Sequence, residues 1–233
     1  MQVKSLSRGA ISPLLLLLRP LWVGVIITIT IACSSRTDPP STFASGYIAD
    51  RGVVRLWRKD DAQDSTTSLM TVYSSFQGED TVITRYAYQQ DKIREIQKTY
   101  LGAQKDEMHI RFAQDGTVSF MQRQLAKRRE QIPDDEIALY QFDAKRILEL
   151  SGVLRAGNVL LQQGKWQNGQ VITCDGKRVR PDFDSATREW IDRRNQPANG
   201  TLNVAWLEGP EGVQLLLMAE ENVCQREPVE VQS

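Results

Sequence analysis

The chain has 233 residues, of which 41% are hydrophobic and 25% are charged, a balance that excludes wholesale disorder and suits one ordinary domain. Lysine and arginine together number 29, as do aspartate and glutamate, so no charge excess indicates a nucleic-acid binder. One histidine and three cysteines exclude a histidine-rich metal site, a zinc finger and a disulfide-dense scaffold.

The N-terminal segment predicts an export signal. Residues 1–32 contain Lys4, Arg8 and Arg19 but no acidic residue, and the apolar run Leu21–Ile31 follows them. A basic stretch, a short apolar run and small residues are the three parts of a secretory signal peptide, and this run is shorter than the roughly 20 residues of a membrane-spanning helix. We therefore expect residues 1–32 to be a signal peptide that places the rest of the chain outside the cytoplasm.

Ile31, Ala32 and Cys33 resemble the lipobox of bacterial lipoproteins, although Thr30 stands where an aliphatic residue is usual. The resemblance implies that Cys33 carries palmitate-type acyl chains and anchors the protein to a membrane, because several chains hold a protein stably. Ser34 after the cysteine implies the periplasmic face of the outer membrane. The alternative is an uncleaved signal anchor with an incidental Cys33, and both interpretations place the body in the cell envelope.

Composition divides the rest of the chain into three parts. Residues 33–46 hold the cysteine and a segment rich in serine, threonine and proline, which we expect to be a flexible tether. Residues 47–226 have the length and composition of a single globular domain. Residues 227–233 are polar and are expected to be a disordered tail.

The first half of the domain predicts antiparallel strands. Six short segments are rich in β-branched and aromatic residues and are separated by turn residues: Val53–Arg58, Leu69–Phe76, Val82–Tyr88, Ile93–Leu101, Met108–Phe112 and Val118–Leu125. Polar and apolar side chains alternate along them, as in a sheet with one packed and one solvated face. Asp115 and Gly116 favour a tight hairpin between the last two segments, so the connectivity predicts a meander.

The pattern changes at Asp134, where apolar residues begin to recur at helical spacing and continue to Gly157. We expect one amphipathic helix of about twenty residues to pack on the inner face of the meander. Further elements follow it: a hairpin of Val159–Gln167 and Gln170–Cys174 around Asn168-Gly169, a short helix at Asp184–Arg194 with Asp184 or Ser185 as its N-terminal cap, and a hairpin of Leu202–Leu207 and Val213–Ala219 around residues 208–212. The predicted fold is α+β, an antiparallel meander or half-barrel packed on one amphipathic helix, with a C-terminal hairpin.

Two cysteines remain in the exported domain once Cys33 is assigned to the lipid anchor. An oxidising compartment favours a disulfide between Cys174 and Cys224, which would close a loop of about 50 residues. The alternative is two free buried thiols. A C-x-x-C pair is absent from the sequence, which argues against a thiol oxidoreductase.

The residues that could carry chemistry do not form a recognisable set. His109 stands alone, and its neighbours Met108 and Ile110 place it on the opposite side of a strand from the apolar positions, which is typical of an ordinary strand histidine. Carboxylate pairs occur at Asp134-Asp135, Glu220-Glu221 and Asp182/Asp184, but helix capping and solvation explain them more simply. The sequence contains no G-x-S-x-G, P-loop or Rossmann glycine pattern. We therefore predict no catalytic residue, metal ligand or cofactor, and we expect the protein not to be an enzyme.

Several segments carry a resemblance to a known family. The resemblance is carried by Cys33 and by three segments. These segments are the predicted helix from Asp134, which ends in Leu150–Gly157, the segment Gln163–Trp166, and Asn203–Leu217, which precedes Cys224. The chain resembles the YjaH-like family of uncharacterised gammaproteobacterial lipoproteins, classed as a domain of unknown function. The resemblance implies a lipoprotein and brings no activity or site residues.

Two hypotheses for function follow from the anchor and the β-rich body. The first is a non-enzymatic binding or structural module attached to the membrane through Cys33, with an unidentified protein or small apolar partner. The alternative is a carrier of an apolar ligand or lipid in a half-barrel cavity. We expect such a cavity to be lined by the helix and by Tyr86, Tyr88, Phe112 and Phe120. The carrier hypothesis fails if Tyr140, Ile147 and Leu154 fill the space.

Overall fold

The computed structural model describes residues 41–77, 81–102, 106–195 and 201–228. The predicted signal peptide, Cys33, the tether up to residue 40 and the tail from residue 229 lie outside the described residues. Within the described part of the chain, every helix is too short or too polar to cross a membrane.

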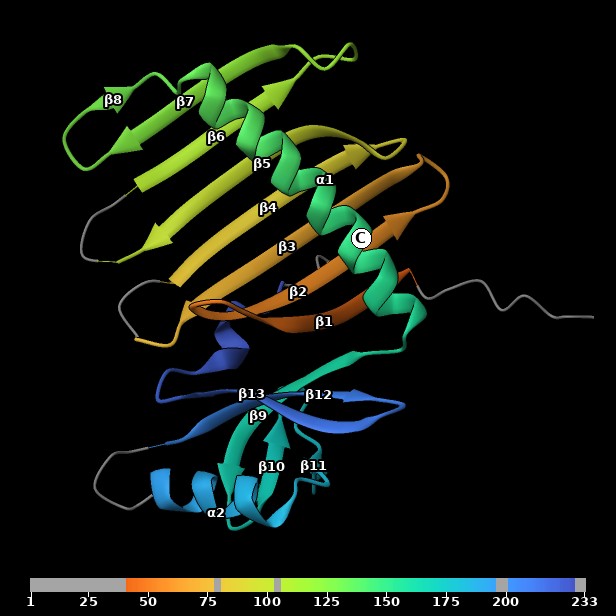
Figure 1. The fold of residues 1–233 in the computed structure, drawn as a ribbon, viewed down its shortest axis with the longest axis vertical. Helices are drawn as coiled ribbons and strands as arrows, with labels where there is room; N and C mark the ends of the chain where they lie inside the picture. The colour runs from red at the N-terminus through yellow and green to blue at the C-terminus, as the bar shows by residue number, and fades with distance from the viewer. Residues whose placement is uncertain (1–40, 78–80, 103–105, 196–200, 229–233) are drawn as a thin grey trace, which may run out of the picture. The chain divides into compact units, whose positions relative to one another are not determined.

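Eight strands follow one another in chain order through an open antiparallel sheet with β1 and β8 at its edges (Figure 1). The strands are β1 Thr42–Ala49, β2 Gly52–Asp61, β3 Thr66–Ser75, β4 Thr81–Gln89, β5 Lys92–Leu101, β6 Asp106–Phe112, β7 Val118–Leu125 and β8 Arg129–Glu130. All six predicted strands are present and the predicted meander is confirmed.

The first strand shows that the predicted tether boundary at residue 46 was wrong. Thr42–Gly46 pair with β2, with Ser45 opposite Leu56, so these residues belong to the sheet. Phe43, Ser45 and Gly46 are buried. The sequence hid this strand because two of its buried positions carry a hydroxyl or no side chain at all, and so produced no apolar alternation.

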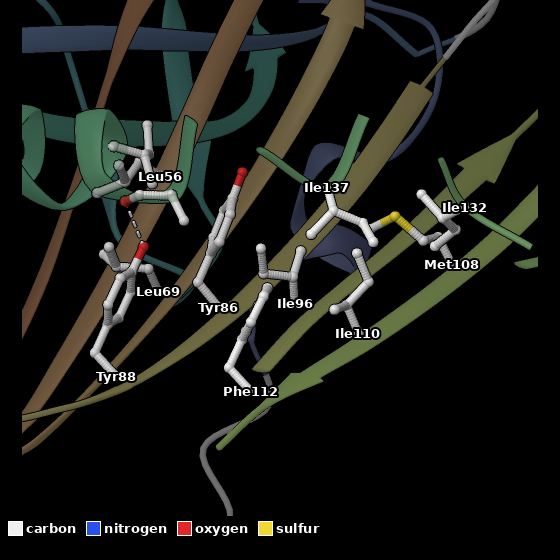
Figure 2. Packing of buried hydrophobic residues seen from close by; sticks show 12 residues of the cluster. Leu56, Leu69, Tyr86, Tyr88, Ile96, Met108, Ile110, Phe112, Ile132 and Ile137 are labelled. Carbon is white, nitrogen blue, oxygen red and sulfur yellow. Dashed lines mark hydrogen bonds between the residues drawn. The ribbon is translucent and has the colours of Figure 1, made fainter. Parts of the chain in front are cut away.

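Helix α1, Asp134–Ala156, covers one face of this sheet, which we call the inner face (Figure 1). Its buried residues Ile137, Ala144, Ile147 and Ser151 recur at helical spacing, and acidic residues in the first turn suit the positive end of the helix dipole. The predicted helix and its packing against the meander are confirmed. Figure 2 shows the core between them, which contains Leu56, Leu69, Tyr86, Tyr88, Ile96, Met108, Ile110, Phe112, Ile132 and Ile137.

A polar cluster around Asp60 fastens the C-terminal part of α1 to the sheet. The Asp60 carboxylate accepts hydrogen bonds from Arg58 Nε (2.9 Å to Oδ2), from Thr67 Oγ1 (2.7 Å) and from Arg155 Nη1 of α1. Arg58 Nη1 also donates to Ser151 Oγ of α1 over 2.8 Å. Partial burial opposes ionisation of Asp60, but hydrogen bonds led by the one from Arg58 outweigh it and lower the pKa of the carboxyl below its ordinary value.

The rest of the chain forms a second antiparallel sheet in the order β11-β10-β9-β12-β13. Its elements are β9 Leu160–Gln167, β10 Gln170–Thr173, β11 Arg178–Val179, α2 Ser185–Arg194, β12 Asn203–Gly209, β13 Gly212–Ala219 and the 3₁₀ turn η1 Val223–Arg226. Asn168 and Gly169 both have positive φ, 52° and 75°, as the predicted tight turn requires. Asp184 caps α2 by accepting from the Thr187 amide over 2.6 Å, which confirms one of the two predicted caps.

The last hairpin has a shorter turn than predicted. Glu208 and Gly209 still pair with Val213 and Gly212, so only Pro210 and Glu211 form the turn. The glycines had suggested a five-residue loop, but within a tight hairpin each can pair as a strand residue.

The second sheet packs against the outer face of β1 and β2, opposite α1. Val53, Leu161, Ala205, Leu207 and Leu216 form the joining apolar cluster. A Cβ on Gly46 would lie 2.6 Å from the Val54 carbonyl oxygen and 2.9 Å from Leu216, so glycine is required for this close approach. Farther along the outer face, Arg85, Gln97 and Arg111 are exposed. The sheet is therefore covered on one side by α1 and only partly on the other.

Candidate functional site

Two neighbouring rows of side chains cross the outer face perpendicular to the strands. Side chains opposite each other in adjacent strands share a face, so the strand register aligns them. The first row is Ala44, Trp57, Met70, Arg85 and Gln97, and the second is Thr42, Lys59, Ser68, Ala87 and Glu95. A groove of about 860 Å³ lies over these rows, with Asp175, Glu227 and Pro228 also lining it. We call it the outer groove, and its volume is in the range of small-molecule sites.

The floor of the outer groove changes from apolar to polar along its length. Ala44, Trp57 and Met70 provide apolar surface on β1, β2 and β3, and Met70 is only 8% exposed. On β4 and β5 the first row continues with the exposed polar side chains of Arg85 and Gln97. The groove can therefore distinguish the two ends of an amphipathic ligand.

The acid on the floor of the groove is fully engaged. Glu95 Oε1 accepts from Gln97 Nε2 at 3.0 Å and from Arg111 Nε at 3.3 Å, and it also contacts His109 Nε2. Partial burial favours the protonated form of Glu95, but these bonds, led by the one from Gln97, outweigh it and lower the pKa of the carboxyl. The negative charge of the Glu95 carboxylate is therefore already offset by neighbouring side chains of the sheet.

The acids that line the groove from the C-terminal half are engaged as well. Asp175 pairs with Lys177 at 2.6 Å, and this contact lowers the pKa of the Asp175 carboxyl to about 2. Glu227 Oε1 accepts from Gln163 Nε2 at 2.7 Å. Glu227 was predicted to belong to the disordered tail, but this bond holds it in place.

Two cations in the groove lack such partners. Lys59 and Arg85 have neither an ion pair nor a side-chain hydrogen bond within the described part of the chain, whereas their neighbour Arg58 is bound to Asp60. Ion pairs with Arg111 and Lys177 offset the charges of Glu95 and Asp175, whereas Glu227 keeps its charge because its partner Gln163 is neutral. The two cations outnumber this one acid, so the groove presents a small excess of positive charge beside an apolar floor.

A buried arginine braces the segment that lines one side of the groove. Arg55 is completely buried, and its Nη1 donates to Gln163 Oε1 at 3.1 Å and to the Val223 carbonyl oxygen at 3.3 Å. Its guanidinium lies 5.9 Å from the centre of the Trp57 ring, in cation–π range. Burial lowers the pKa of Arg55 to about 10, so the side chain stays charged at neutral pH. Through Gln163, Arg55 is connected to Glu227 at the groove.

The predicted disulfide is confirmed. Cys174 and Cys224 are joined by an S–S bond of 2.04 Å across a sequence separation of 50 residues. Cys174 follows β10 and Cys224 lies in η1, so the bond ties the Asn168-Gly169 hairpin to the turn after the last strand. The disulfide and Arg55 together fix η1 and the segment to Pro228.

Three of the four strand residues that we expected to line an inner cavity pack in the core instead. Tyr86, Tyr88 and Phe112 belong to the cluster that α1 fills with Ile147, and Tyr140 packs against it. The Tyr88 hydroxyl donates a hydrogen bond to the Ala144 carbonyl oxygen at 2.7 Å, and this bond holds α1 against β4. Phe120 lies on the outer face, 40% exposed, with its ring 5.1 Å from that of His109. The predicted inner cavity is therefore wrong, because helix side chains occupy that space. Leu154, which was also considered for filling it, is half-buried.

The remaining candidates occupy simple structural positions. His109 lies opposite the buried Met108 and Ile110, as predicted, and pairs with Glu95. Asp134 and Asp135 are in the first turn of α1. In the described ranges, no three histidine, cysteine or acidic side chains gather in a way that could hold a metal ion. The sequence did not reveal the outer groove, because only the register of five strands brings its rows together.

Comparisons with known proteins agree on one family. Residues 44–229 match the model described as "Protein of unknown function (DUF1481)". The chain is 36% identical over 230 residues to "Uncharacterized protein YjaH" of Escherichia coli (strain K12), and the alignment covers 98% of this chain and 99% of that protein. No solved structure matches the chain.

Proposed function

The chain belongs to the DUF1481 family of proteins of unknown function, and from its geometry we propose that it is a lipid-anchored envelope protein that binds a partner in the outer groove. The membership confirms the family resemblance predicted from the sequence. Under this proposal Cys33 attaches the chain to the periplasmic face of the outer membrane, and the body acts by binding rather than by catalysis.

The observation that carries the binding role is the outer groove itself. Lys59 and Arg85 stand unpaired beside the apolar floor, as far as the described residues extend. An open apolar groove with unpaired charges does not stabilise the domain itself. A ligand that covers the apolar surface and pairs with the charges gains binding free energy from both contacts. The opposite side is held by Arg55 and the Cys174–Cys224 bond, which makes the groove a preorganised site.

Two observations support export and anchoring. A disulfide persists in oxidising compartments, which suits a periplasmic location for the body. The order of basic residues, apolar run and Ile31-Ala32-Cys33 is that of a lipoprotein signal.

The anchor is tested by replacing the acylated thiol. Cells are fed an alkyne-bearing fatty acid, and the protein is isolated and examined for label and for its N-terminus. The wild type should be labelled, begin at Cys33 and sediment with membranes. Cys33→Ser should lose the label and leave the membrane fraction or keep its leader, whereas the neighbouring change Ser35→Ala should alter none of these. Equal labelling of Cys33→Ser and wild type would refute lipidation at this residue.

A second candidate function is carriage of an apolar ligand in the outer groove, which we propose in place of the half-barrel cavity on the inner face that the helix side chains fill. The observation that favours it is the apolar floor of Ala44, Trp57 and Met70 in a groove of about 860 Å³. Native mass spectrometry of the purified protein should then show a co-purifying small molecule. Blocking the floor with Ala87→Trp should remove that molecule, and its retention in the variant would place it elsewhere.

A further inference from the structure

We propose that the outer groove binds a single-chain anionic amphiphile of the long-chain fatty-acid type. Its chain lies on Ala44, Trp57 and Met70, and its acid group meets Arg85. The inference rests on the proposed function only in taking the outer groove as the binding site.

The dimensions of the floor fit one acyl chain. Ala44, Trp57, Met70 and Arg85 lie on four successive strands, β1 to β4, as direct cross-strand neighbours. Adjacent strands are about 4.8 Å apart, so the row spans about 14 Å. The hydrocarbon core of a bilayer is about 30 Å thick and contains two chains end to end, which gives each chain about 15 Å. A chain that starts at Arg85 therefore reaches β1, where the floor ends.

The strands that form the floor favour a hydrocarbon chain over an extended peptide as the ligand. β2, β3 and β4 each pair with a strand on both sides, so their backbone N–H and C=O groups are already bonded. A peptide laid across them would bury its own backbone groups without partners, which costs free energy for every group. A hydrocarbon chain has no such groups and gains from burial, about 0.8 kcal/mol for each methylene.

The charges of the groove select an anion. Glu95, Asp175 and Glu227 are each bonded to a neighbouring side chain, whereas Arg85 and Lys59 are unpaired among the described residues. Arg85 stands where the apolar floor ends, opposite Gln97 on β5. A guanidinium binds a carboxylate through two parallel hydrogen bonds, so the polar end of the ligand is placed at β4 and its chain under the C-terminal segment.

Photo-crosslinking tests the site, the ligand class and the orientation together. The full protein, processed by the cell and held in phosphatidylcholine nanodiscs, is exposed to palmitic acid with a diazirine at the chain end and to the methyl ester of the same probe. Mass spectrometry should locate the crosslinks on β1 and β2, near Ala44 and Trp57. Unlabelled palmitic acid should compete about tenfold better than its methyl ester, the difference expected for one charge-assisted contact.

Two variants test whether the charge of Arg85 contributes to binding of the acid. Arg85→Gln should weaken binding of the acid about tenfold and leave binding of the ester unchanged. Arg188→Gln, an exposed arginine of α2, is the matched control and should leave both unchanged. The urea midpoints of both variants are measured to confirm that they fold like the wild type.

Other outcomes would overturn the inference at defined points. Equal binding of acid and ester refutes an anionic ligand, and no effect of Arg85→Gln refutes Arg85 as the partner of its acid group; both results keep the outer groove as a site. Crosslinks on the exposed side of α1, where Leu139 and Phe142 lie, refute the groove. Crosslinking that arises only after truncation behind Pro228 identifies the chain's own last residues as the occupant. No specific crosslink at all, together with no co-purifying molecule, refutes both the ligand and the binding role.

Discussion

Nη1 of Arg55 donates to Oε1 of Gln163 over 3.1 Å, and this bond joins strands of the two sheets that are 108 residues apart in sequence. Both side chains are buried. Among the described residues, Arg55 Nε and Nη2 are buried without a hydrogen-bond partner, so the bonds of Nη1 alone hold the guanidinium. Because a buried charge depends on the few bonds that it has, the pair specifies how the second sheet lies on the first. The same Gln163 reaches Glu227, which connects this interface with the groove.

The first prediction concerns the coupling of this pair. Gln163→Leu should lower the free energy of unfolding by about 2–3 kcal/mol, because it leaves the buried guanidinium short of an acceptor. Arg55→Met removes the charge as well, so the double variant should be less destabilised than the sum of the single variants, with a coupling of about 1–3 kcal/mol. Urea unfolding of the four proteins measures this value, and simple additivity would contradict the role of the bond.

Arg55 also shows why part of the fold could not be predicted from the sequence. Strand β2 alternates Val53, Arg55 and Trp57 on one face with Val54 and Leu56 on the other. Such a pattern predicts one solvated face, but the second sheet covers this face and buries Arg55 there. Periodicity reports the strand, whereas burial of its polar side depends on tertiary contacts that are distant in sequence.

Features set by local chemistry were predictable. The helical spacing after Asp134, the positive φ of Asn168 and Gly169, and the cap at Asp184 were all visible in the sequence. The outer groove was not, because Trp57, Met70 and Arg85 become neighbours only through the register of three strands.

The second prediction concerns the disulfide. Replacing Cys174 and Cys224 together by serine should lower the free energy of unfolding by about 4 kcal/mol, since the bond closes a loop of 50 residues and restricts the unfolded chain. Urea unfolding of the wild type with and without dithiothreitol should show the same loss. The double variant is the control, and its midpoint should not respond to the reductant. A wild-type midpoint that is also unaffected would contradict the stabilising role of the bond.

The third prediction is a pH dependence that originates at Asp60. Its pKa in the folded protein lies below the unfolded value near 3.8, so its stabilising contribution is fully present above that value and is lost as the pH falls through the lower folded pKa. Asp60→Asn should therefore destabilise the protein strongly at pH 7 and much less at pH 2.5. Urea unfolding at both values measures the difference. Asp61→Asn, at an exposed neighbour, serves as the control. The same loss at both pH values would exclude the carboxylate as the cause.

The fourth prediction compares two glycines with opposite roles. Gly46→Ala should destabilise the protein by about 1–3 kcal/mol, because the new Cβ would lie 2.6 Å from the Val54 carbonyl oxygen and 2.9 Å from Leu216 of the second sheet. Gly152 lies within α1, and a Cβ added there would meet no atom within 4 Å beyond its own helical neighbours, so Gly152→Ala should stabilise the helix by about 1 kcal/mol. Thermal and urea unfolding of the two variants measure both effects. Because the same methyl group is added in each case, an unchanged or raised stability of Gly46→Ala would show that the close approach does not require glycine at this position.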